Sequence, residues 1–204
     1  MAQRPAILAV LAGGLGRRLA GGKATAPLGG RPLICHTLAA ARATGLETLV
    51  VAKRSTALPR LRERVLYEPE RPRHPLCGAL AALELAATRA GAPAVVLLAC
   101  DMPFLTSPLL AWLAGLDAGA AMAVLDGRPQ PLLSRCLPEQ RASLRRALAS
   151  RRALGEAIAE LSPRLLGERE LARFGRPERL CFNVNDGDDL RLAERWLAGE
   201  SGAG

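Results

Sequence analysis

A glycine-rich, basic loop follows the first apolar segment of this 204-residue chain. The apolar run 6–11 breaks at Gly13 and Gly14, an arginine pair follows, and Lys23 comes directly after two more glycines. Because glycine has no Cβ, backbone N–H groups in such a loop can approach an anion closely, and the cations neutralise its charge. The loop therefore predicts a binding site for a polyphosphate.

Two common phosphate-binding motifs do not match this loop. A Walker A loop needs glycine at the position of Arg17 and serine or threonine at the position of Ala24. A dinucleotide-binding fingerprint that starts at Gly14 needs a third glycine at the position of Leu19. The loop is basic and glycine-rich without belonging to either type.

Lys23 and Lys53 are the only lysines in a chain whose net charge of +9 comes almost wholly from arginine. Where positive charge alone suffices, this chain uses arginine. Lysine in the loop therefore indicates a need for a compact ammonium group rather than a wide fork, and we expect Lys23 to contact phosphate. Arg17 or Arg18 is expected to share this contact, and the sequence leaves open which of the two does.

A second candidate, Asp101, comes directly after the apolar run 94–99 and Cys100. A carboxylate at the carboxyl end of a buried strand lies at the sheet edge where the glycine loop also opens. Mg²⁺ is commonly held by one or two carboxylates together with substrate phosphates, so this position predicts a magnesium ligand. The alternative is that Asp101 only caps the following turn.

Two other segments contain polar side chains that could bind a ligand but could equally have a structural role. Asp126-Gly127 is typical of a tight turn between strands, which needs no ligand. Asn183 and Asn185 alternate along a short segment and can present an amide to a ligand, whereas Asn185 or Asp186 can instead cap the last helix. The sequence leaves both questions open.

The elements that must position these groups alternate between strands and helices. Apolar β-rich runs predict strands over 6–11, 47–52, 65–67, 94–99, 120–125, 131–137 and 181–184. Helical periodicity predicts helices over 33–42, 55–64, 75–89, 106–113 and 186–198, and one or two helices over 139–161. The segment 68–74 is a proline-rich loop, and 167–173 is poorly defined. This alternation predicts a three-layer α/β domain with a mostly parallel sheet.

Composition is that of an ordinary globular protein, with half of the residues apolar. We expect one domain over residues 1–199, followed by a disordered tail over 200–204. No apolar run approaches the roughly 20 residues that span a bilayer, and no signal peptide is evident, so we expect a cytoplasmic protein.

The remaining residue types point to no other chemistry. The five cysteines are spread out without a CxxC pair, which predicts buried free thiols. His36 lies in an apolar segment and is expected to be structural. Aromatic residues make up only 3% of the chain and the basic residues are dispersed, which argues against a nucleic-acid partner.

Five sequence motifs follow one another along the chain: LAGG…RR…GGK…PLGGRPL in 11–33, PLCG in 75–78, CDMPF in 100–104, DGRPQPL in 126–132 and FNVND in 182–186. Together and in this order, they resemble the motifs of the molybdenum cofactor guanylyltransferases, the molybdopterin-guanine dinucleotide biosynthesis protein A family of glycine-loop nucleotidyltransferases. The resemblance implies a Rossmann-like α/β/α sandwich of the nucleotide-diphospho-sugar transferase type. It also implies transfer of GMP from GTP to the terminal phosphate of molybdopterin, with Mg²⁺ and release of pyrophosphate.

The resemblance also implies roles for individual residues. The nucleotide site would comprise the start of the loop, its lysine and two acidic residues: Leu11, Ala12, Gly13, Gly14, Lys23, Glu68 and Asp101. Lys23, Asp101 and Arg18 would be catalytic, and Asp101 would hold the metal. Glu70 is a second candidate for the acidic position beside the guanine base.

The chain departs from the family pattern at three positions. Gly22 precedes Lys23 where the family usually has an aspartate, with a slightly longer loop. Lys53 or its neighbourhood replaces an asparagine after the second strand, and His74 replaces a glycine. These departures concern the loop and the base side of the site.

The expected partners are GTP and molybdopterin, with proteins of molybdenum insertion or molybdoenzyme maturation as further candidates, and neither nucleic acid nor membrane. A monomer is expected. Two alternatives stay open: a cytidylyltransferase that acts on molybdopterin, and a nucleotide-binding protein without catalysis.

Overall fold

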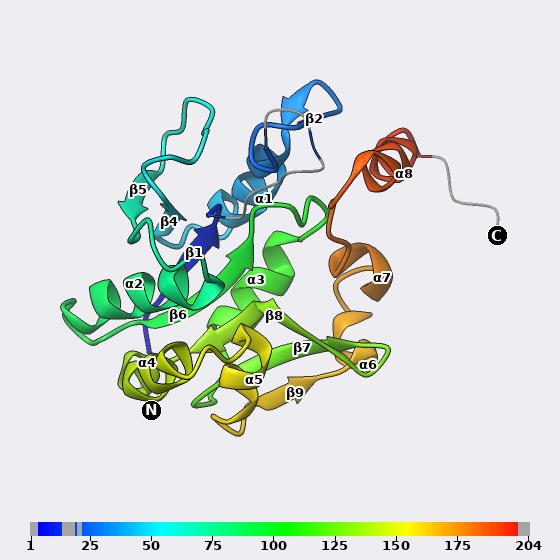
Figure 1. Ribbon diagram of the computed structural model, residues 1–204. Helices are drawn as coiled ribbons and strands as arrows, with labels where there is room; N and C mark the ends of the chain where they lie inside the picture. The colour runs from blue at the N-terminus through cyan, green and yellow to red at the C-terminus, as the bar shows by residue number, and fades with distance from the viewer. Residues whose placement is uncertain (1–3, 14–18, 20–21, 200–204) are drawn as a thin grey trace.

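A seven-stranded sheet runs through the centre of the protein, in the order β5-β4-β1-β6-β8-β7-β9 (Figure 1). The computed structural model describes residues 4–13, 19 and 22–199. The strands of this sheet are β1 (Ala6–Leu11), β4 (Thr48–Ala52), β5 (Arg64–Tyr67), β6 (Ala94–Ala99), β7 (Ala121–Leu125), β8 (Arg128–Cys136) and β9 (Arg164–Leu166). All neighbouring strands are parallel except β8, which is antiparallel to β6 and β7. The predicted, mostly parallel sheet is confirmed.

The three central strands end at the same level. Leu11, the last residue of β1, pairs with Val51 of β4 on one side and with Ala99 of β6 on the other. On the far side of β4, Ala52 pairs with Tyr67 at the end of β5. The segments that follow β1, β4, β5 and β6 therefore all begin at one edge of the sheet, where parallel α/β proteins bind ligands.

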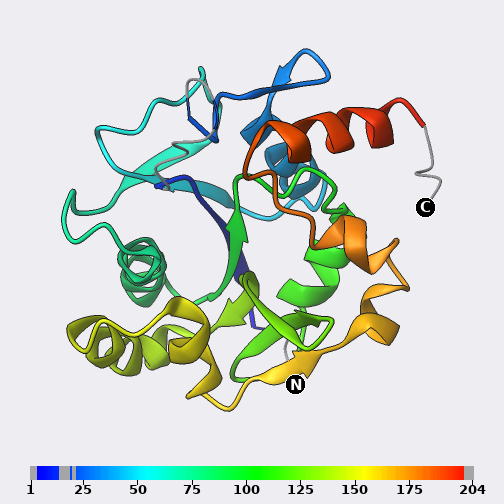
Figure 2. The same ribbon diagram turned by 45° about the vertical axis from the view of Figure 1, so that its right-hand side comes forward.

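Side chains of the central strands alternate between two apolar cores. Leu8 and Val10 of β1 face one core, and Ile7, Ala9 and Leu11 face the other, because successive strand residues point to opposite faces. Each core is closed by helices, so that the sheet lies between two helical layers (Figure 2). The predicted three-layer α/β/α sandwich is confirmed.

Helices α1 (Leu33–Arg42) and α3 (Ser107–Ala114) contribute to the first core, together with the short helices α6 (Glu168–Leu171) and α7 (Pro177–Leu180). The second core is covered by α2 (Pro75–Ala87), α4 (Arg141–Ala149) and α5 (Leu154–Ala159). A short 3₁₀ helix, Pro138–Gln140, precedes α4. No helix in the described part of the chain is long and apolar enough to cross a membrane.

A third, smaller apolar cluster joins the two ends of the chain. Strands β2 (Pro27–Leu28) and β3 (Arg31–Pro32) form a tight hairpin, whose turn residues Gly29 and Gly30 have positive φ angles of 54° and 73°. Helix α8 (Gly187–Leu197) packs beside β2 through Ala193 (Figure 2). Val184, in the segment before α8, belongs to the same cluster as Leu19 and Ala26.

Two expected elements are wrong. The segment 55–64 is not a helix; Leu58 and Leu61 pack against the first core from irregular backbone, and Pro59 disfavours a helix at this point. The strand expected over 181–184 is irregular too. The poorly defined 167–173 contains α6, and the expected tail 200–204 lies outside the described residues.

Candidate functional site

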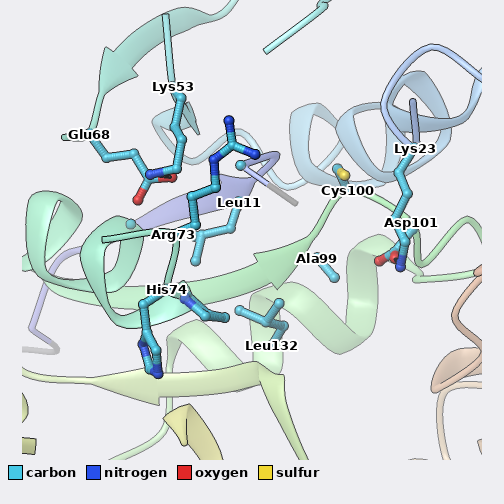
Figure 3. Close-up of a pocket in the computed structure, with 13 residues that line it drawn as sticks. Leu11, Lys23, Lys53, Glu68, Arg73, His74, Ala99, Cys100, Asp101 and Leu132 are labelled. Carbon is cyan, nitrogen blue, oxygen red and sulfur yellow. Dashed lines mark hydrogen bonds and ion pairs between the residues drawn. The ribbon is translucent and has the colours of Figure 1, made fainter. Parts of the chain in front are cut away.

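A cavity of about 230 Å³ opens at the carboxyl edge of the sheet (Figure 3). Lys23 and Asp101 line one end of it, Lys53 and Glu68 line the other, and Leu11 lies between them. A second cavity of about 320 Å³ adjoins the first and shares both lysines with it. Both lysines of the chain thus face one cleft, and each has a carboxylate partner.

At one end of this cleft, Lys23 joins the glycine loop to β6 and to the C-terminal segment. Its Nζ lies 2.5 Å from Asp101 Oδ2 and 2.7 Å from Asn185 Oδ1. The backbone N–H of Val184 donates to the Asp101 carbonyl oxygen at 2.9 Å, which fixes the C-terminal segment beside the end of β6. Asn185 thus presents its amide oxygen to Lys23, and the expectation that an amide of this segment contacts a ligand stays a prediction.

At the other end, Lys53 and Glu68 form a buried ion pair. Their side chains follow β4 and β5, and only 4% of Lys53 and 8% of Glu68 is exposed. Lys53 Nζ lies 3.2 Å from Glu68 Oε1 and donates to the Pro69 carbonyl oxygen at 2.5 Å. The second oxygen, Glu68 Oε2, is buried and accepts no hydrogen bond from the described residues.

The Glu68 carboxylate lies directly against Gly13, which follows β1. A Cβ at Gly13 would be 2.2 Å from Glu68 Oε1, and a Cβ at Gly78 of α2 would be 3.2 Å from Oε2. Burial raises the pKa of the Glu68 carboxyl, whereas the hydrogen bond and the charge of Lys53 lower it. Glycine at position 13 thus makes room for an acidic side chain that arrives from another strand.

Glu68, rather than Glu70, is the acidic residue of this cavity. The Glu70 carboxylate accepts hydrogen bonds from the Ser55 backbone N–H at 3.1 Å and from the Ser55 hydroxyl at 2.6 Å. These hydrogen bonds lower the pKa of Glu70 and hold its carboxylate on the irregular segment after β4. Of the two candidates, Glu68 lines the cavity and Glu70 does not.

Some of the other predicted site residues line the cleft, and the rest lie outside the described residues. Leu11 and Gly13 line the first cavity, and Ala12 and Gly13 line the second. The rest of the predicted phosphate-binding residues, Gly14, Arg17 and Arg18, lie outside the described residues.

Several residues have the structural roles that were weighed against function. Asp126 and Gly127 have φ angles of 49° and 68°, as in a tight turn between β7 and β8, and Asp126 lines neither cavity. Asp186 caps α8 by accepting from the backbone N–H groups of Asp188 and Asp189. His36 contacts the Leu28 carbonyl oxygen at 2.9 Å. The five cysteines are free as expected, and all of them except Cys35 are buried.

The residues around Asp101 fit a magnesium ion shared with a substrate rather than a closed protein cage. No group of three or more His, Cys, Asp or Glu that could hold a metal occurs within residues 4–13, 19 and 22–199. Mg²⁺ is typically bound by one or two carboxylates together with phosphate oxygens and water. Asp101, with the Asn185 amide oxygen nearby, supplies that kind of partial donor set.

Sequence reasoning missed two residues of the cleft. Lys53 was noted only as a departure from the family pattern, although its rarity in an arginine-rich chain was a usable signal. Arg73 lines both cavities from the proline-rich loop, and nothing in the sequence distinguished it from the neighbouring arginines.

Comparison with known proteins gives one consistent family. The family model for the MobA-like NTP transferase domain matches residues 8–168. A molybdenum cofactor guanylyltransferase from Cereibacter sphaeroides is 36% identical over 92% of this chain and 95% of its own length. A probable molybdenum cofactor guanylyltransferase from Haloferax mediterranei is 31% identical over 89% of this chain and 90% of its own.

Solved structures share the fold. Molybdopterin-guanine dinucleotide biosynthesis protein A from Archaeoglobus fulgidus superposes with a TM-score of 0.76 at 24% identity, covering 95% of this chain and 99% of that one. The 2-C-methyl-D-erythritol 4-phosphate cytidylyltransferase from Thermus thermophilus gives a TM-score of 0.66 at 21% identity, covering 97% and 100%. The expected nucleotide-diphospho-sugar transferase type of sandwich is thus shared with nucleotidyltransferases of different substrates.

Proposed function

This chain belongs to the MobA-like NTP transferase family, and from that premise we propose that it transfers GMP from GTP to the terminal phosphate of molybdopterin. Pyrophosphate is the second product. The observation that carries this proposal is the cleft with a Lys–carboxylate pair at each end, one suited to phosphates and a metal and one to a base. The curated relatives support the choice of GTP and molybdopterin through their names.

The phosphate end of the cleft needs to supply charge and position rather than covalent chemistry. An oxygen of the molybdopterin phosphate forms a bond to the α-phosphorus of GTP, and the bond from that phosphorus to the bridging oxygen breaks, so that pyrophosphate leaves with the electron pair. The attacking phosphate is already an anion, so no general base is required. Positioning of two anions and neutralisation of their charge lower the barrier.

Lys23 and Asp101 divide these tasks in our proposal. The Lys23 ammonium group has three donors, and it binds the triphosphate with the N–H groups of the glycine loop and Arg18 or Arg17. Asp101 would hold Mg²⁺ together with phosphate oxygens of the substrate. When bound, Mg²⁺ supplies positive charge to the phosphate oxygens. Lys23 then exchanges its contact with the Asp101 carboxylate for contacts with phosphate.

At the other end of the cleft, the Glu68 carboxylate accepts hydrogen bonds from the guanine base in our proposal. An ionised carboxylate offers two acceptor oxygens, which complement the adjacent N1–H and N2–H donors of guanine. Adenine and cytosine place an acceptor nitrogen beside their donor, so that one carboxylate oxygen would face a lone pair. The buried Oε2 atom without a donor supports this assignment, because a buried acceptor is costly unless a ligand satisfies it.

Substitution of Gly13 by alanine should weaken GTP binding by at least about tenfold, the equivalent of one charge-assisted hydrogen bond. The new Cβ would lie 2.2 Å from Glu68 Oε1 and would displace the carboxylate from the base. Isothermal titration calorimetry with GTP and ATP measures the effect. Gly167→Ala is the matched control, because nothing lies within 4 Å of a Cβ there. Unchanged GTP affinity and base preference in Gly13→Ala would rule out the assigned position of Glu68.

Pyrophosphate release with GTP, CTP and ATP, each supplied with molybdopterin, tests the reaction. We expect release with GTP and a loss of at least about a hundredfold when a chelator removes Mg²⁺. Release with CTP instead would identify the cytidylyltransferase alternative. Release with none of the three would indicate a nucleotide-binding protein without catalysis.

We further propose that residues 1–199 form one catalytic domain, which acts as a monomer in the cytoplasm and receives molybdopterin from proteins of molybdenum insertion or molybdoenzyme maturation. The two cores flank one continuous sheet, which supports a single domain. Light scattering after gel filtration tests the monomer.

A further inference from the structure

Lys53 occupies an unusual place for a lysine, because it is buried at the end of the cleft farthest from Lys23 (Figure 3). Its Nζ contacts Glu68 Oε1 at 3.2 Å and the Pro69 carbonyl oxygen at 2.5 Å. An ammonium group is costly to bury unless charged or polar partners surround it. Of the two Glu68 carboxylate oxygens, Lys53 contacts Oε1, and Oε2 has no donor among the described residues.

The charge state of Glu68 decides which base it can pair with. The ionised carboxylate has two acceptor oxygens and matches the two donors of guanine, whereas the protonated acid has one donor and one acceptor. That second pattern matches adenine, with its N1 acceptor and N6 donor, and cytosine, with its N3 acceptor and N4 donor. A proton on Glu68 would therefore remove the preference for guanine.

We propose that Lys53 is a positioning residue that sets guanine selectivity, because it holds Glu68 as a carboxylate through Oε1 and leaves Oε2 without a protein donor, a role that rests on the proposed function. The ion pair affects base selectivity indirectly, because Lys53 contacts Glu68 and not the substrate. The asymmetric pairing of Lys53 with Oε1 alone is the observation that carries it.

The groups around Glu68 act in opposite directions. Burial and the charge of Glu70 raise the pKa of Glu68, and the hydrogen bond and the charge of Lys53 lower it. Cys77 on α2 faces the same carboxylate, and the pKa of its thiol is raised by burial and by the Glu68 charge. Arg73 and His74 line the same cavity, and no ion pair joins either of them to Glu68 in the described structure. Lys53 is the cation in contact with Glu68.

The test is the ratio of GTP and ATP dissociation constants, measured by calorimetry on the full chain with Mg²⁺ between about pH 6.5 and about pH 8.5. Titration of the triphosphate affects both nucleotides and cancels in this ratio. In the wild type, the preference for GTP should vary by less than about twofold above about pH 7, because the hydrogen bond and the charge of Lys53 oppose the rise in the Glu68 pKa that burial causes. In Lys53→Met, the preference should rise at least about threefold from the lowest to the highest pH, because burial without a cation raises a glutamate pKa by up to about 3–5 units.

The direction of this pH dependence follows from the raised pKa of Glu68 in Lys53→Met. A raised pKa means that Glu68 is protonated at low pH, so guanine selectivity is lost as the pH falls and returns as it rises. Lys53→Met/Glu68→Gln has no titrating group at this position and should show no pH dependence. Lys53→Arg keeps a cation and should restore the flat wild-type profile.

A preference in Lys53→Met that does not change with pH, at either the wild-type or a lowered level, would overturn the proposal, because a merely structural role predicts that result. If Lys53→Met does not fold, Lys53→Gln provides the same test, since it keeps a donor for Glu68 without the charge. A wild type without any preference for GTP would overturn the proposed base choice as well. A GTP-selective wild type with a pH-independent variant would overturn only the role of Lys53.

Discussion

Replacing Asp101 with asparagine should lower the rate of GMP transfer by about a hundredfold or more and leave the fold intact. Asparagine keeps the shape of the side chain and loses its charge, and Mg²⁺ prefers anionic carboxylate oxygens. The backbone contact of Asp101 with Val184 does not involve the side chain and should persist. Steady-state turnover with GTP and molybdopterin, together with thermal unfolding, measures both effects.

Asp117→Asn is the matched control for this prediction. Asp117 is exposed and follows α3, so that the same chemical change there should leave turnover within about twofold of the wild type. Turnover near the wild-type rate in Asp101→Asn would remove Asp101 from the metal site. The reading of Asp101 as a simple turn cap would then be preferred.

Substitution of Lys23 by alanine should lower GMP transfer by at least about tenfold, because a cation is lost where charge develops on the phosphates. Lys23→Arg should recover only part of this activity. The Lys23 ammonium group fits between the Asp101 and Asn185 side chains at 2.5 and 2.7 Å, and a planar guanidinium fork is larger. Measurement of kcat and KM for the two variants compares the loss of charge with the change of shape.

A second measurement on Lys23→Ala separates its role from a general loss of structure. Lys23 and a divalent cation use the same Asp101 carboxylate, so removing the ammonium group should tighten the binding of Mn²⁺, used as a spectroscopic probe, in the absence of nucleotide. Lys23→Ala/Asp101→Asn is the control and should bind Mn²⁺ no better than Asp101→Asn alone. Weaker Mn²⁺ binding in Lys23→Ala would contradict competition between Lys23 and the metal.

The sheet and its layers could be predicted from sequence because the strands are short apolar runs between clear helical patterns. Hydrophobic periodicity predicted a wrong helix and a wrong strand in two segments whose structure is decided by their packing against the rest of the protein. The segment 55–64 has apolar residues at helical spacing around Pro59 but forms no helix. The segment 181–184 is not a strand either; the Val184 N–H donates to the Asp101 carbonyl oxygen, and the N–H groups of Cys181 and Phe182 donate to carbonyl oxygens of the preceding turn. The antiparallel direction of β8 depends on tertiary pairing with β6, which spacing alone does not specify.

The site was predictable in part, for a similar reason. Lys23 and Asp101 lie together because β1 and β6 are adjacent and end at the same level, which follows from a parallel sheet. The pairing of Lys53 with Glu68 depends on the register of β4 with β5, and a shift of one residue would move both side chains. Glu70 could be set apart from Glu68 only once its hydrogen bonds to Ser55 were known.

The most direct test of the central claim is a competition in which equal amounts of GTP, CTP and ATP are supplied together with molybdopterin and Mg²⁺, and the dinucleotide products are identified by mass. The proposed function predicts the guanine dinucleotide form as the main product, with one pyrophosphate released for each GMP transferred. A cytosine or adenine dinucleotide as the main product, or no dinucleotide at all, would contradict it.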